Sequence, residues 1–466
     1  MIKLPSHIYF AGIGGIGVSA LAQLALEKGS AVSGADNSAK SNENPALFRL
    51  LEKGVVIYND HNAGNIGQEV DMVVASAAVS NNSPDLVEAR KRGIPFQSRA
   101  EFLGALMAAH SGTKIAIAGT HGKTTTTSLV GVMLKYAGLS PTVFVGGEVP
   151  QLGGNVHLGS DAGPFVAEAC EAYDSFLFLK PDIAVITSVE ADHLDHFGDV
   201  ANMHKSYLEF AKNTISTGGK LIYCADDEGA VHIASLLNFE YCVPYSIEEL
   251  EDVSYFPNPT FKWNGNTVSL GIPGKHNVLN SLAALHIQPL LHNLTAEQAI
   301  NGVMSFSGVG RRQEILGEIK LKDGSALVID DYAHHPTEIS ATLNAIRNAY
   351  PASRIIAIFQ PHLYSRTRDF MSGFASSLST ADCILITDIY AAREAPMPEI
   401  RASDIAMLIS NKFHNKSVHY IPNTKDIPAS VLDIAQNKDI ILFMGAGDIN
   451  IQAERLIQYS NSGCMA

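Results

Sequence analysis

Short apolar runs alternate with longer stretches of helical spacing along this chain. Each apolar run is rich in Val, Ile, Ala or Phe and predicts a buried strand, and the stretch that follows predicts a covering helix, the first over Ser19–Lys28. Buried strands separated by helices predict an α/β protein with mostly parallel sheets that helices cover on both faces. The predicted strands are His7–Gly12, Ala31–Asp36, Met72–Ser76, Lys114–Ala118, Phe165–Ala169, Ile183–Val189, Leu221–Ala225, Ala326–Ile329, Arg354–Phe359, Cys383–Thr387 and Ile440–Met444.

The length of 466 residues is typical of about three domains. We expect one boundary just before the strand at Lys114 and a second near residues 306–316, where Gly and Arg accumulate. Residues 247–274 are rich in Asn, Pro and Tyr, and they predict antiparallel strands or loops late in the middle domain. The expected domains are residues 1–110, 111–313 and 314–466.

The formal net charge of −14 at pH 7 argues against a nucleic-acid binder, which normally carries a basic face. We expect no membrane span, because no run of about twenty apolar residues occurs. We expect no secretory signal, because Met1–Pro5 leads directly into a predicted strand. Scattered cysteines without metal-ligand spacing predict free thiols in a reducing compartment. These features favour a cytoplasmic monomer or homodimer that acts on small molecules, with no nucleic acid or membrane as partner. The cysteines are Cys170, Cys224, Cys242, Cys383 and Cys464.

A glycine-rich segment lies between the first predicted strand and the first predicted helix. Glycines let the backbone approach a diphosphate, and the helix that follows adds the positive end of its dipole. Asp36 ends the next strand, where a carboxylate can accept from a ribose hydroxyl. We therefore predict a nucleotide diphosphate site, with NAD left open as a ligand and a tight packing turn as the alternative. Its residues are Gly12, Gly14, Gly15, Gly17 and Asp36.

A second phosphate loop follows the strand Lys114–Ala118. Its backbone N–H groups would hold phosphates, Lys123 would bridge the β- and γ-phosphate oxygens, and the Thr124 hydroxyl would ligate magnesium. The loop is shorter than the common GxxxxGK[ST] pattern, since Ile117 stands at the first glycine position. We predict an ATP site here, and a purely structural turn is the alternative. The site comprises Gly119, Thr120, His121, Gly122, Lys123, Thr124 and Thr125.

Acidic and imidazole side chains follow two further strands of the middle domain. Glu168 ends one predicted strand, and Glu190–His196 follows the next. The carboxyl ends of parallel strands meet at one edge of a sheet, so these groups can converge on a cation shared with phosphates. We predict a magnesium site at Thr124, Glu168 and His193; a zinc site or a capped loop with solvated charges is the alternative. Lys205 is either a surface lysine or reaches this metal region.

The segment Gly274–Asn280 opens another predicted helix. His276, Asn277 and Asn280 are candidates for contacts with a base or a phosphate. Helix capping would account for one of the two asparagines without any ligand.

Basic and imidazole side chains also follow strands of the last domain. Arg311 and Arg312 lie at the expected boundary, and Asp330–Pro336 follows the first strand after it. In the segment Gln360–Arg368, two arginines one residue apart suit a carboxylate or a phosphate, because guanidinium groups bind planar oxyanions bidentately. A solvated basic turn is the alternative.

Taken in order, these motifs resemble those of the Mur ligase family of bacterial peptidoglycan synthesis. The resemblance extends from His7 to about Ile451, and six motifs in the same order are far more specific than any one of them. The motifs are Gly12–Gly17, Gly119–Thr125, Glu190–Asp195, Gly274–Asn280, Asp330–Pro336 and Gln360–Arg368.

The resemblance implies a Rossmann-like N-terminal domain for a UDP-linked substrate, a central P-loop ATPase domain and a Rossmann-like C-terminal domain for an amino acid. It implies ATP-dependent amide formation with Mg²⁺, in which the lactyl carboxylate of UDP-N-acetylmuramate attacks the γ-phosphate and the amine of L-alanine attacks the resulting acyl phosphate. D-Glutamate-adding, tripeptide-recycling and folylpolyglutamate ligases are the alternatives within the superfamily. The glycines near the N-terminus and the Gln360–Arg368 motif favour addition of L-alanine.

The resemblance also implies roles for individual residues, since phosphoryl transfer depends on positioning and charge neutralisation. Metal ligands would be Thr124, Glu168 and His193. Beyond the second loop, ATP would be served by His276, Asn277, Asn280, Arg311 or Arg312, and Asp331. Catalysis would involve Lys123, His193, His335, Arg366 and Arg368, and L-alanine would be bound by His362, Arg366 and Arg368.

One departure from the family pattern concerns the acidic segment after the strand Phe165–Ala169. Many relatives carry Glu-Ala-Asp-Glu where this chain has Glu168–Glu171, so Cys170 replaces an aspartate. Glu168 is retained and keeps its predicted metal role. Several relatives carbamylate a lysine in the region of Lys205, and this modification stays open.

Two hypotheses outside the ligases also stay open. An NAD-dependent dehydrogenase would explain the first glycine segment, but Lys123, Thr124 and the third domain argue against it. An ATP-switched sensor of nucleotide sugars would leave Glu168, His193 and the arginine pair without a purpose.

Overall fold

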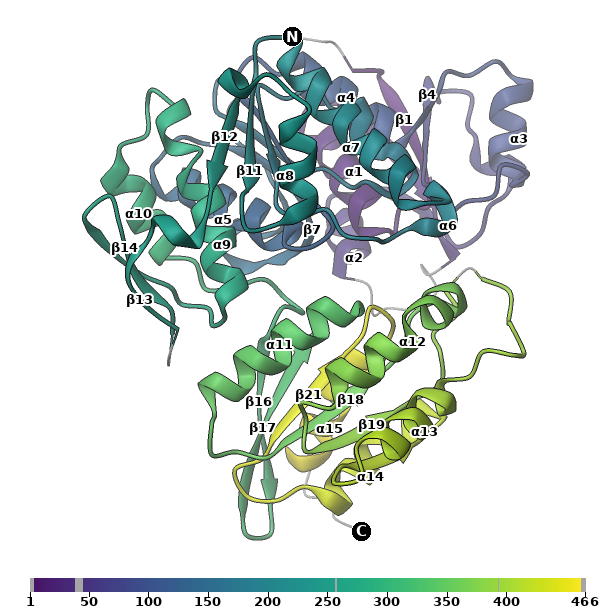
Figure 1. Ribbon diagram of the computed structural model, residues 1–466. Coiled ribbons are helices and arrows are strands. Elements are labelled where there is room, and N and C mark those ends of the chain that lie inside the picture. Colours follow the sequence, from purple (N-terminus) through teal and green to yellow (C-terminus); the bar gives the residue numbers. More distant parts are fainter. Residues whose placement is uncertain (1–3, 38–44, 256–257, 393, 462–466) are drawn as a thin grey trace. The chain divides into compact units, whose positions relative to one another are not determined.

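The structure is a computed structural model that describes residues 4–37, 45–255, 258–392 and 394–461 (Figure 1). The predicted free thiol Cys464 lies outside the described residues, and the other four cysteines are free. The chain forms two compact units. The first comprises Met1–Glu249 and Leu279–Phe306, and the second comprises Leu250–Val278 and Ser307–Ala466.

The first unit begins with a five-stranded parallel sheet of order β3-β2-β1-β4-β5. Helices α1, α2 and α4 pack on one face, and α3 with a short 3₁₀ helix, η2, packs on the other. The strands are β1 (His7–Ala11), β2 (Ala31–Ala35), β3 (Val56–Tyr58), β4 (Met72–Ala75) and β5 (Phe96–Ser98). The helices are α1 (Ile16–Glu27), α2 (Pro45–Glu52), η2 (Ala63–Asn65), α3 (Pro84–Lys91) and α4 (Arg99–Ala109).

The second sheet of this unit has seven strands in the order β12-β11-β10-β6-β9-β7-β8, of which only β7 and β8 pair antiparallel. Its strands are β6 (Lys114–Ala118), β7 (Thr142–Val149), β8 (Gly154–His157), β9 (Phe165–Glu168), β10 (Ile183–Ile186), β11 (Lys220–Cys224) and β12 (Cys242–Tyr245). Its helices are α5 (Lys123–Tyr136), α6 (Leu194–Phe197), α7 (Val200–Ile215), α8 (Glu228–Ser235) and α10 (Ala296–Met304). Short 3₁₀ helices are η3 (Pro150–Leu152), η4 (Ala172–Phe178), η5 (Phe239–Tyr241), η6 (Ile247–Glu249) and η7 (Gln288–Leu290).

The two sheets of the first unit share one hydrophobic core. A single cluster joins Phe10 and Phe102 of the first sheet and its helix to Phe165 and Phe176 of the second. The packing is close enough that a Cβ at Gly104 of α4 would lie 2.4 Å from the carbonyl oxygen of Phe178. The two sheets therefore form a single packed body.

The second unit contains a small antiparallel sheet and a larger, mostly parallel one. The small sheet has the order β13-β14-β15, and the large one has the order β16-β17-β21-β18-β19-β20, with only β16 and β17 antiparallel. Helices α11, α12 and α13 pack on one face of the large sheet, and α14 and α15 pack on the other (Figure 1). The strands are β13 (Glu251–Ser254), β14 (Thr260–Trp263), β15 (Asn266–Ser269), β16 (Glu314–Leu321), β17 (Gly324–Asp331), β18 (Ile355–Phe359), β19 (Cys383–Ile386), β20 (Ser417–Tyr420) and β21 (Ile440–Met444). The helices are α11 (Pro336–Ala349), α12 (Tyr364–Leu378), α13 (Ala402–Lys412), η8 (Thr424–Asp426), α14 (Ile427–Ile434) and α15 (Ile449–Asn461), while α9 (Lys275–Leu285) runs from this unit into the first.

The predicted α/β class with mostly parallel sheets is confirmed, and every strand predicted from an apolar run is present. The antiparallel strands expected within residues 247–274 are also present, and β13–β15 group with the second unit. The domain boundaries at residues 110 and 313 stay predictions. No helix within the described ranges combines the length and the apolar character that a bilayer crossing requires.

A buried carboxylate fastens α3 and the loop before it to the first sheet. Asp85 of α3 is fully buried, and its carboxylate accepts from the Tyr9 hydroxyl of β1 at 2.9 Å, from Ser83 and from the Leu86 backbone N–H at 2.8 Å. The ring of His61 lies 2.6 Å from the same carboxylate. Burial alone would raise the pKa of Asp85, but the hydrogen bonds from Ser83, His61 and Tyr9 outweigh it and hold the pKa below its ordinary value.

Replacing Asp85 by Ala should therefore destabilise the first unit. We expect a loss of about 3 kcal/mol in the free energy of unfolding at neutral pH, because several buried donors lose their acceptor. Since the native pKa is lowered, this contribution is present at neutral pH and is lost as the pH falls below about 4. Denaturation of Asp85→Ala and of the control Glu52→Ala, an exposed site expected to change by less than about 0.5 kcal/mol, measures it. Equal costs of Asp85→Ala at neutral and strongly acidic pH would contradict this account.

Candidate active site

The second phosphate loop lies at the carboxyl-end edge of the seven-stranded sheet. It leaves β6 after Ala118, and the segment that leaves the neighbouring strand β10 holds it in place. The backbone N–H of Thr120 donates to the carbonyl of Ser188 at 2.9 Å, and the N–H of His121 donates to the Ser188 hydroxyl at 2.9 Å. The N–H of Glu190 in turn donates to the Thr120 hydroxyl at 2.9 Å. The loop is therefore shaped by the strand ends around it.

Two glycines are required by this geometry. Gly119 has φ +136° and a Cβ there would lie 2.0 Å from the Thr187 hydroxyl oxygen. Gly122 has φ +80°, caps helix α5, and a Cβ there would lie 2.5 Å from Oδ1 of Asn280. Side chains at either position would be strained and would collide with the structure, so the glycines let the loop close over the helix N-terminus.

Lys123, the first residue of α5, is enclosed by acceptors. Its ammonium donates to the carbonyls of Gly119 at 2.5 Å and Thr120 at 3.1 Å, and to Oε1 of Glu171 at 2.9 Å. The Glu171 side chain is 2% exposed and that of Lys123 is 14% exposed. Burial alone would lower the pKa of Lys123, but the Glu171 carboxylate, with smaller effects of Cys170 and Glu168, raises it above its ordinary value.

The predicted magnesium ligands Thr124 and Glu168 lie together. The Thr124 hydroxyl donates to Oε1 of Glu168 at 3.0 Å, and the Gly146 backbone N–H donates to Oε2 at 2.6 Å. Glu168 ends β9, which pairs with β6 just before the loop, and this pairing places the carboxylate beside the start of α5. A hydroxyl and a carboxylate next to a phosphate loop are the donors that Mg²⁺ takes up with a nucleotide.

The third predicted ligand, His193, lies on the other side of Glu171. Its Nε2 is 3.9 Å from Oε1 of Glu171 and 3.9 Å from Oδ2 of Asp192. His193 caps α6 in the left-handed region, with φ +52°, a conformation that costs a non-glycine residue free energy. The imidazole, the ammonium of Lys123 and the carboxylate of Glu171 thus form one charged cluster at the loop.

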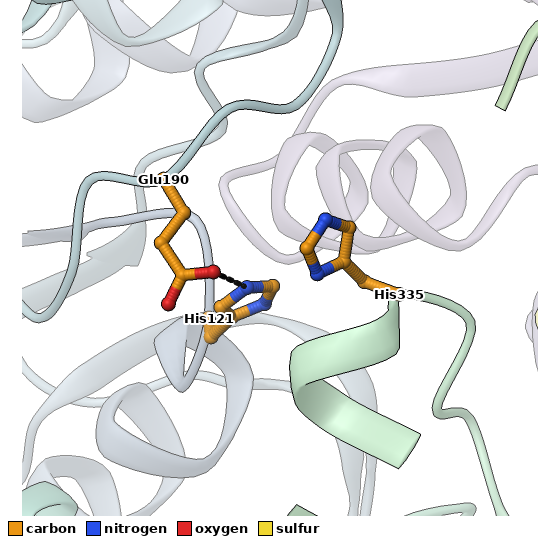
Figure 2. Close-up of side chains that lie close together, drawn as sticks. All are labelled: His121, Glu190 and His335. Carbon is orange, nitrogen blue, oxygen red and sulfur yellow. Dashed lines mark ion pairs between the residues drawn. The ribbon is translucent and has the colours of Figure 1, made fainter. Parts of the chain in front are cut away.

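The imidazole of His121, inside the loop, pairs with the next strand-end segment. Its Nε2 lies 3.4 Å from Oε2 of Glu190. Figure 2 draws this ion pair as a dashed line. Both the backbone and the side chain of Glu190 therefore contact the loop, through Thr120 and His121. The Glu190 contacts, together with those of Ser188, orient the backbone N–H groups of the loop.

The first glycine segment forms a turn between β1 and α1. Gly12 has φ +79° and a Cβ there would lie 2.9 Å from that of Ser76, so glycine is required. The Gly14 backbone N–H donates to Oδ2 of Asp36 at 2.8 Å. Asp36 thus contacts the loop itself and helps to shape the turn, and its bond to a ribose hydroxyl stays a prediction.

Groups from other elements surround the start of α1. A Cβ at Gly17 would lie 3.1 Å from a guanidinium nitrogen of Arg99, the first residue of α4. The Asn155 amide of β8 donates to the carbonyl of Ile16 at 2.6 Å. A guanidinium beside a helix N-terminus and a glycine turn provides positive potential for a diphosphate.

The segment that opens α9 contributes to the loop through one residue. The Thr126 hydroxyl donates to Oδ1 of Asn280 at 3.1 Å, and the same oxygen lies over Gly122. The Asn277 amide donates to the carbonyl of Pro273 at 2.7 Å, so it stabilises the start of α9.

In the second unit, the ring of His276 lies 3.3 Å from the Gln313 amide nitrogen. Burial, assisted by the Arg312 charge, lowers the pKa of His276 to about 4, so its ring is neutral at pH 7.

The two arginines at the expected domain boundary, Arg311 and Arg312, differ in their surroundings. Arg311 lies 3.3 Å from Asp330 and donates to the carbonyl of Gly445 at 2.8 Å, so its guanidinium is used within the second unit. Arg312 lies 3.6 Å from Glu338. Which of the two arginines meets a phosphate stays open.

Two buried aspartates follow one another at the end of β17. Burial raises the pKa of Asp330 to about 7 although Arg311 is nearby. Burial raises the pKa of Asp331 to about 6, against the Arg312 charge and hydrogen bonds from the Ala333 and Gln313 backbone. Perturbed carboxyl groups at the carboxyl end of a strand are typical of functional sites.

The structure does not bring the predicted arginine pair together. Arg366 and Arg368 lie on α12 with one residue between them, and helical spacing therefore points them in different directions. Arg366 is buried, with its guanidinium 3.3 Å from Nδ1 of His362, whereas Arg368 is exposed and pairs with Asp369 at 2.7 Å. His335 caps α11, and its Nδ1 accepts from the Thr337 N–H. His362 and Arg366 therefore form a close pair, and Arg368 lies apart from it.

Sequence reasoning missed two residues of this region. In the sequence, Glu171 was considered only as part of the segment Glu168–Glu171, which contains Cys170. The signal that could have identified it is a negative charge that can pair with the lysine of a phosphate loop. Arg99 lies far from the first glycine segment in sequence and opens a helix by a Ser98–Glu101 capping box, so nothing local identified it. Both become visible only when strands and helices are placed side by side.

Comparisons with known proteins match most of the chain. Residues 7–111 match the Mur ligase family catalytic domain, residues 117–287 the Mur ligase middle domain and residues 311–447 the Mur ligase glutamate ligase domain. A UDP-N-acetylmuramate–L-alanine ligase from Clostridium kluyveri is 40% identical over 95% of this chain and 96% of its own length.

Solved structures agree with this. A UDP-N-acetylmuramate–alanine ligase from Thermotoga maritima superposes with a TM-score of 0.81 at 28% identity, covering 98% of this chain and 99% of that one. A murein peptide ligase from Psychrobacter arcticus superposes with a TM-score of 0.72 at 25% identity, over 99% of both chains. On its sequence, its fold and its phosphate loop, the chain belongs to the Mur ligase family.

Proposed function

We propose that the chain joins L-alanine to the lactyl carboxylate of UDP-N-acetylmuramate, with hydrolysis of ATP to ADP and phosphate. The observation that carries this is a phosphate loop whose Lys123 and Thr124 contact buried or strand-end carboxylates, in a chain that shares 40% identity over 95% of its length with an L-alanine-adding ligase. Among the solved structures, the murein peptide ligase is less similar to this chain than the alanine ligase, with 25% against 28% identity and a TM-score of 0.72 against 0.81.

In this proposal the loop at residues 119–125 binds the phosphates of ATP. Its N–H groups and the N-terminus of α5 face the oxygens, and Lys123 neutralises charge on the phosphoryl group that is transferred. Thr124, Glu168 and His193 would hold Mg²⁺, which would supply further neutralisation of the phosphate charge. The Thr124 hydroxyl and the Glu168 carboxylate lie 3.0 Å apart, so two of the three groups are already close together.

The first glycine segment serves the diphosphate of the UDP-linked substrate. Gly12 and Gly15 keep the turn open at the N-terminus of α1, and Asp36 fixes the Gly14 N–H. Arg99 adds a positive charge there. The absence of a lysine and hydroxyl pair beside this segment fits a ligand that is bound and not cleaved.

In the second unit we assign His335, His362, Arg366 and Arg368 to L-alanine and the acyl phosphate. We assign His276, Arg311 or Arg312, and Asp331 to ATP. Asn277 and Asn280 would serve ATP from the start of α9, where Asn277 bonds to the carbonyl of Pro273 and Asn280 bonds to Thr126 after the phosphate loop. The neutral ring of His276 suits a hydrogen bond to a base or sugar better than an ion pair with a phosphate. Free Cys170, Cys224, Cys242 and Cys383 fit a reducing cytoplasm, in which ATP is available.

The chemistry proceeds in two displacements. A carboxylate oxygen of UDP-N-acetylmuramate attacks the γ-phosphorus, ADP leaves, and an acyl phosphate forms. The amine nitrogen of L-alanine then attacks the acyl carbon, the amine loses a proton, and phosphate leaves through a tetrahedral intermediate. Lys123 acts in the first displacement, where it neutralises the transferred phosphoryl group, and the guanidinium of Arg366 would hold the alanine carboxylate so that its amine is free.

Phosphate release from ATP should require both other substrates. Because the acyl phosphate forms only on the lactyl carboxylate and turns over only with an amine, omission of UDP-N-acetylmuramate or L-alanine should reduce sustained release to background. A coupled phosphate assay with L-alanine, glycine, L-serine and D-glutamate measures this. Loss of one methyl group costs a pocket about 1–3 kcal/mol, so glycine should be used more weakly than L-alanine. Equal release without either substrate would refute the ligase function.

Replacing Lys123 by Ala should abolish turnover and leave the diphosphate site intact. We expect a loss of activity of at least about a thousandfold, because the charge on the transferred phosphoryl group loses its cation. Calorimetry should still detect UDP-N-acetylmuramate, since the first glycine segment is separate from this loop. Lys212, an exposed lysine of α7, gives the control Lys212→Ala, which should keep full activity. If Lys123→Ala also lost binding of UDP-N-acetylmuramate, the two loops would not be separate sites.

A further inference from the structure

We infer that Tyr390 is a positioning residue for the amino-acid substrate, because its backbone and its ring hold His362 in the orientation in which that histidine meets the carboxylate of L-alanine. This inference rests on the proposed function, since it takes His362 and Arg366 as groups that bind the amino acid. Tyr390 lies in none of the sequence motifs and follows a different strand, β19.

The backbone of Tyr390 runs beside the segment that carries His362. The two residues form a parallel β-bridge beyond the ends of β18 and β19. The Tyr390 N–H donates to the carbonyl of Pro361 at 2.8 Å, and the Leu363 N–H donates to the carbonyl of Tyr390 at 3.0 Å. These two hydrogen bonds fix the backbone on either side of His362, so the histidine cannot shift along the sheet edge without breaking one of them.

Leu363, the residue after His362, has a backbone conformation that residues with a side chain rarely adopt. Its φ is +69° and its ψ is 139°. Strained residues persist where the surrounding structure over-determines them, and they gather at ligand sites. The Leu363 carbonyl accepts from the Thr367 N–H at 3.1 Å and from the Thr367 hydroxyl at 2.8 Å. Tyr390 on one side and the first turn of α12 on the other therefore hold the sharp change of direction after His362.

The ring of Tyr390 stacks on the ring of His362. Their centroids lie 5.8 Å apart and their planes differ by 13°, which is typical of a stacked pair. The Tyr390 ring also packs on the backbone of Gly447, where a Cβ would lie 2.7 Å from Cγ of Tyr390. Because Gly447 has no side chain, the tyrosine ring can occupy this space, and its position fixes the plane of the His362 ring.

The stacked ring of His362 directs one nitrogen at Arg366. Its Nδ1 lies 3.3 Å from a guanidinium nitrogen of Arg366. Since a guanidinium group only donates, Nδ1 accepts and the ring proton is on Nε2. An N–H donor next to a guanidinium suits a carboxylate, which only accepts. Rotation of the imidazole would break the bond to Arg366 and turn the Nε2–H away, and the stack with Tyr390 opposes that rotation.

The loop after β19 also holds the start of α12. The carboxylate of Glu394 accepts from the Ser365 N–H at 3.0 Å and from the Ser365 hydroxyl. Ser365 lies between His362 and Arg366 in the chain, so this loop fixes the amino-acid segment at two points. Tyr390 contacts the side chain of His362 itself, which makes it the residue to test.

The test is a double-mutant cycle of Tyr390 and His362, measured as KM and kcat in the coupled phosphate assay. Tyr390→Leu keeps the apolar bulk and removes the flat ring. It should raise the KM for L-alanine about tenfold and leave the KM for ATP and for UDP-N-acetylmuramate within about twofold, because only the amino-acid groups are displaced. His362→Ala should raise the same KM, and adding Tyr390→Leu to it should have no further effect, because Tyr390 acts through His362.

Two variants provide the controls. Tyr390→Phe keeps the ring and should match wild type. Tyr459→Ala, at a half-exposed tyrosine of α15, should leave every KM unchanged. Should Tyr390→Leu fail to fold, Tyr390→Met replaces it in the cycle, since methionine also fills the space without a flat ring.

Several outcomes would overturn the inference. Additive effects in the cycle would show that Tyr390 does not act through His362, and an equal rise of KM for all three substrates would indicate a merely structural role. A wild-type KM in Tyr390→Leu would make the stack dispensable, and a loss in Tyr390→Phe would make the hydroxyl the active group. Wild type without L-alanine-dependent turnover would refute the proposed function, which the variants alone cannot do.

Discussion

The ammonium of Lys123 is the group on which the first unit's catalytic edge depends. It joins the glycine loop after β6, the segment after β9 and, through Glu171, the imidazole after β10. None of these segments has the right shape without its neighbours, since the loop hydrogen-bonds to Ser188 and Glu190 and its glycines lie against Thr187 and Asn280. A parallel sheet brings these three carboxyl ends to one edge, where the ammonium of Lys123 links them.

The need for a fixed geometry between two binding sites explains why the first unit contains two sheets that share a core. The Asn155 amide of the second sheet reaches the carbonyl of Ile16 beside the first glycine segment, and Arg49 pairs with Glu148 at 2.7 Å. A substrate with a diphosphate at one end and a carboxylate at the other needs a fixed distance between its two sites. A continuous hydrophobic core between the sheets provides that rigidity in this unit.

The fold was largely predictable because its buried strands are apolar on both faces. Strands such as β6 and β21 were predicted with their exact bounds, whereas short edge strands such as β3 and β20 have exposed residues and no clear pattern. In the site, motifs within one segment were predictable: Lys123 with Thr124, and Glu168 at a strand end. Glu171 and Arg99 were not, because their significance comes from neighbours distant in sequence. Helical spacing turns Arg366 inward and Arg368 outward, which the sequence motif did not show, and their joint role stays a prediction.

An acyl phosphate is the central claim of the proposed function, because it explains why one chain carries an ATP loop, a diphosphate loop and groups for an amino acid. Its most direct test is isotope transfer. With ¹⁸O in both oxygens of the lactyl carboxylate of UDP-N-acetylmuramate, ATP and L-alanine, the phosphate released should carry one ¹⁸O atom per turnover, detected by mass spectrometry. Phosphate free of ¹⁸O would mean that the carboxylate never attacked the γ-phosphorus and would contradict the account.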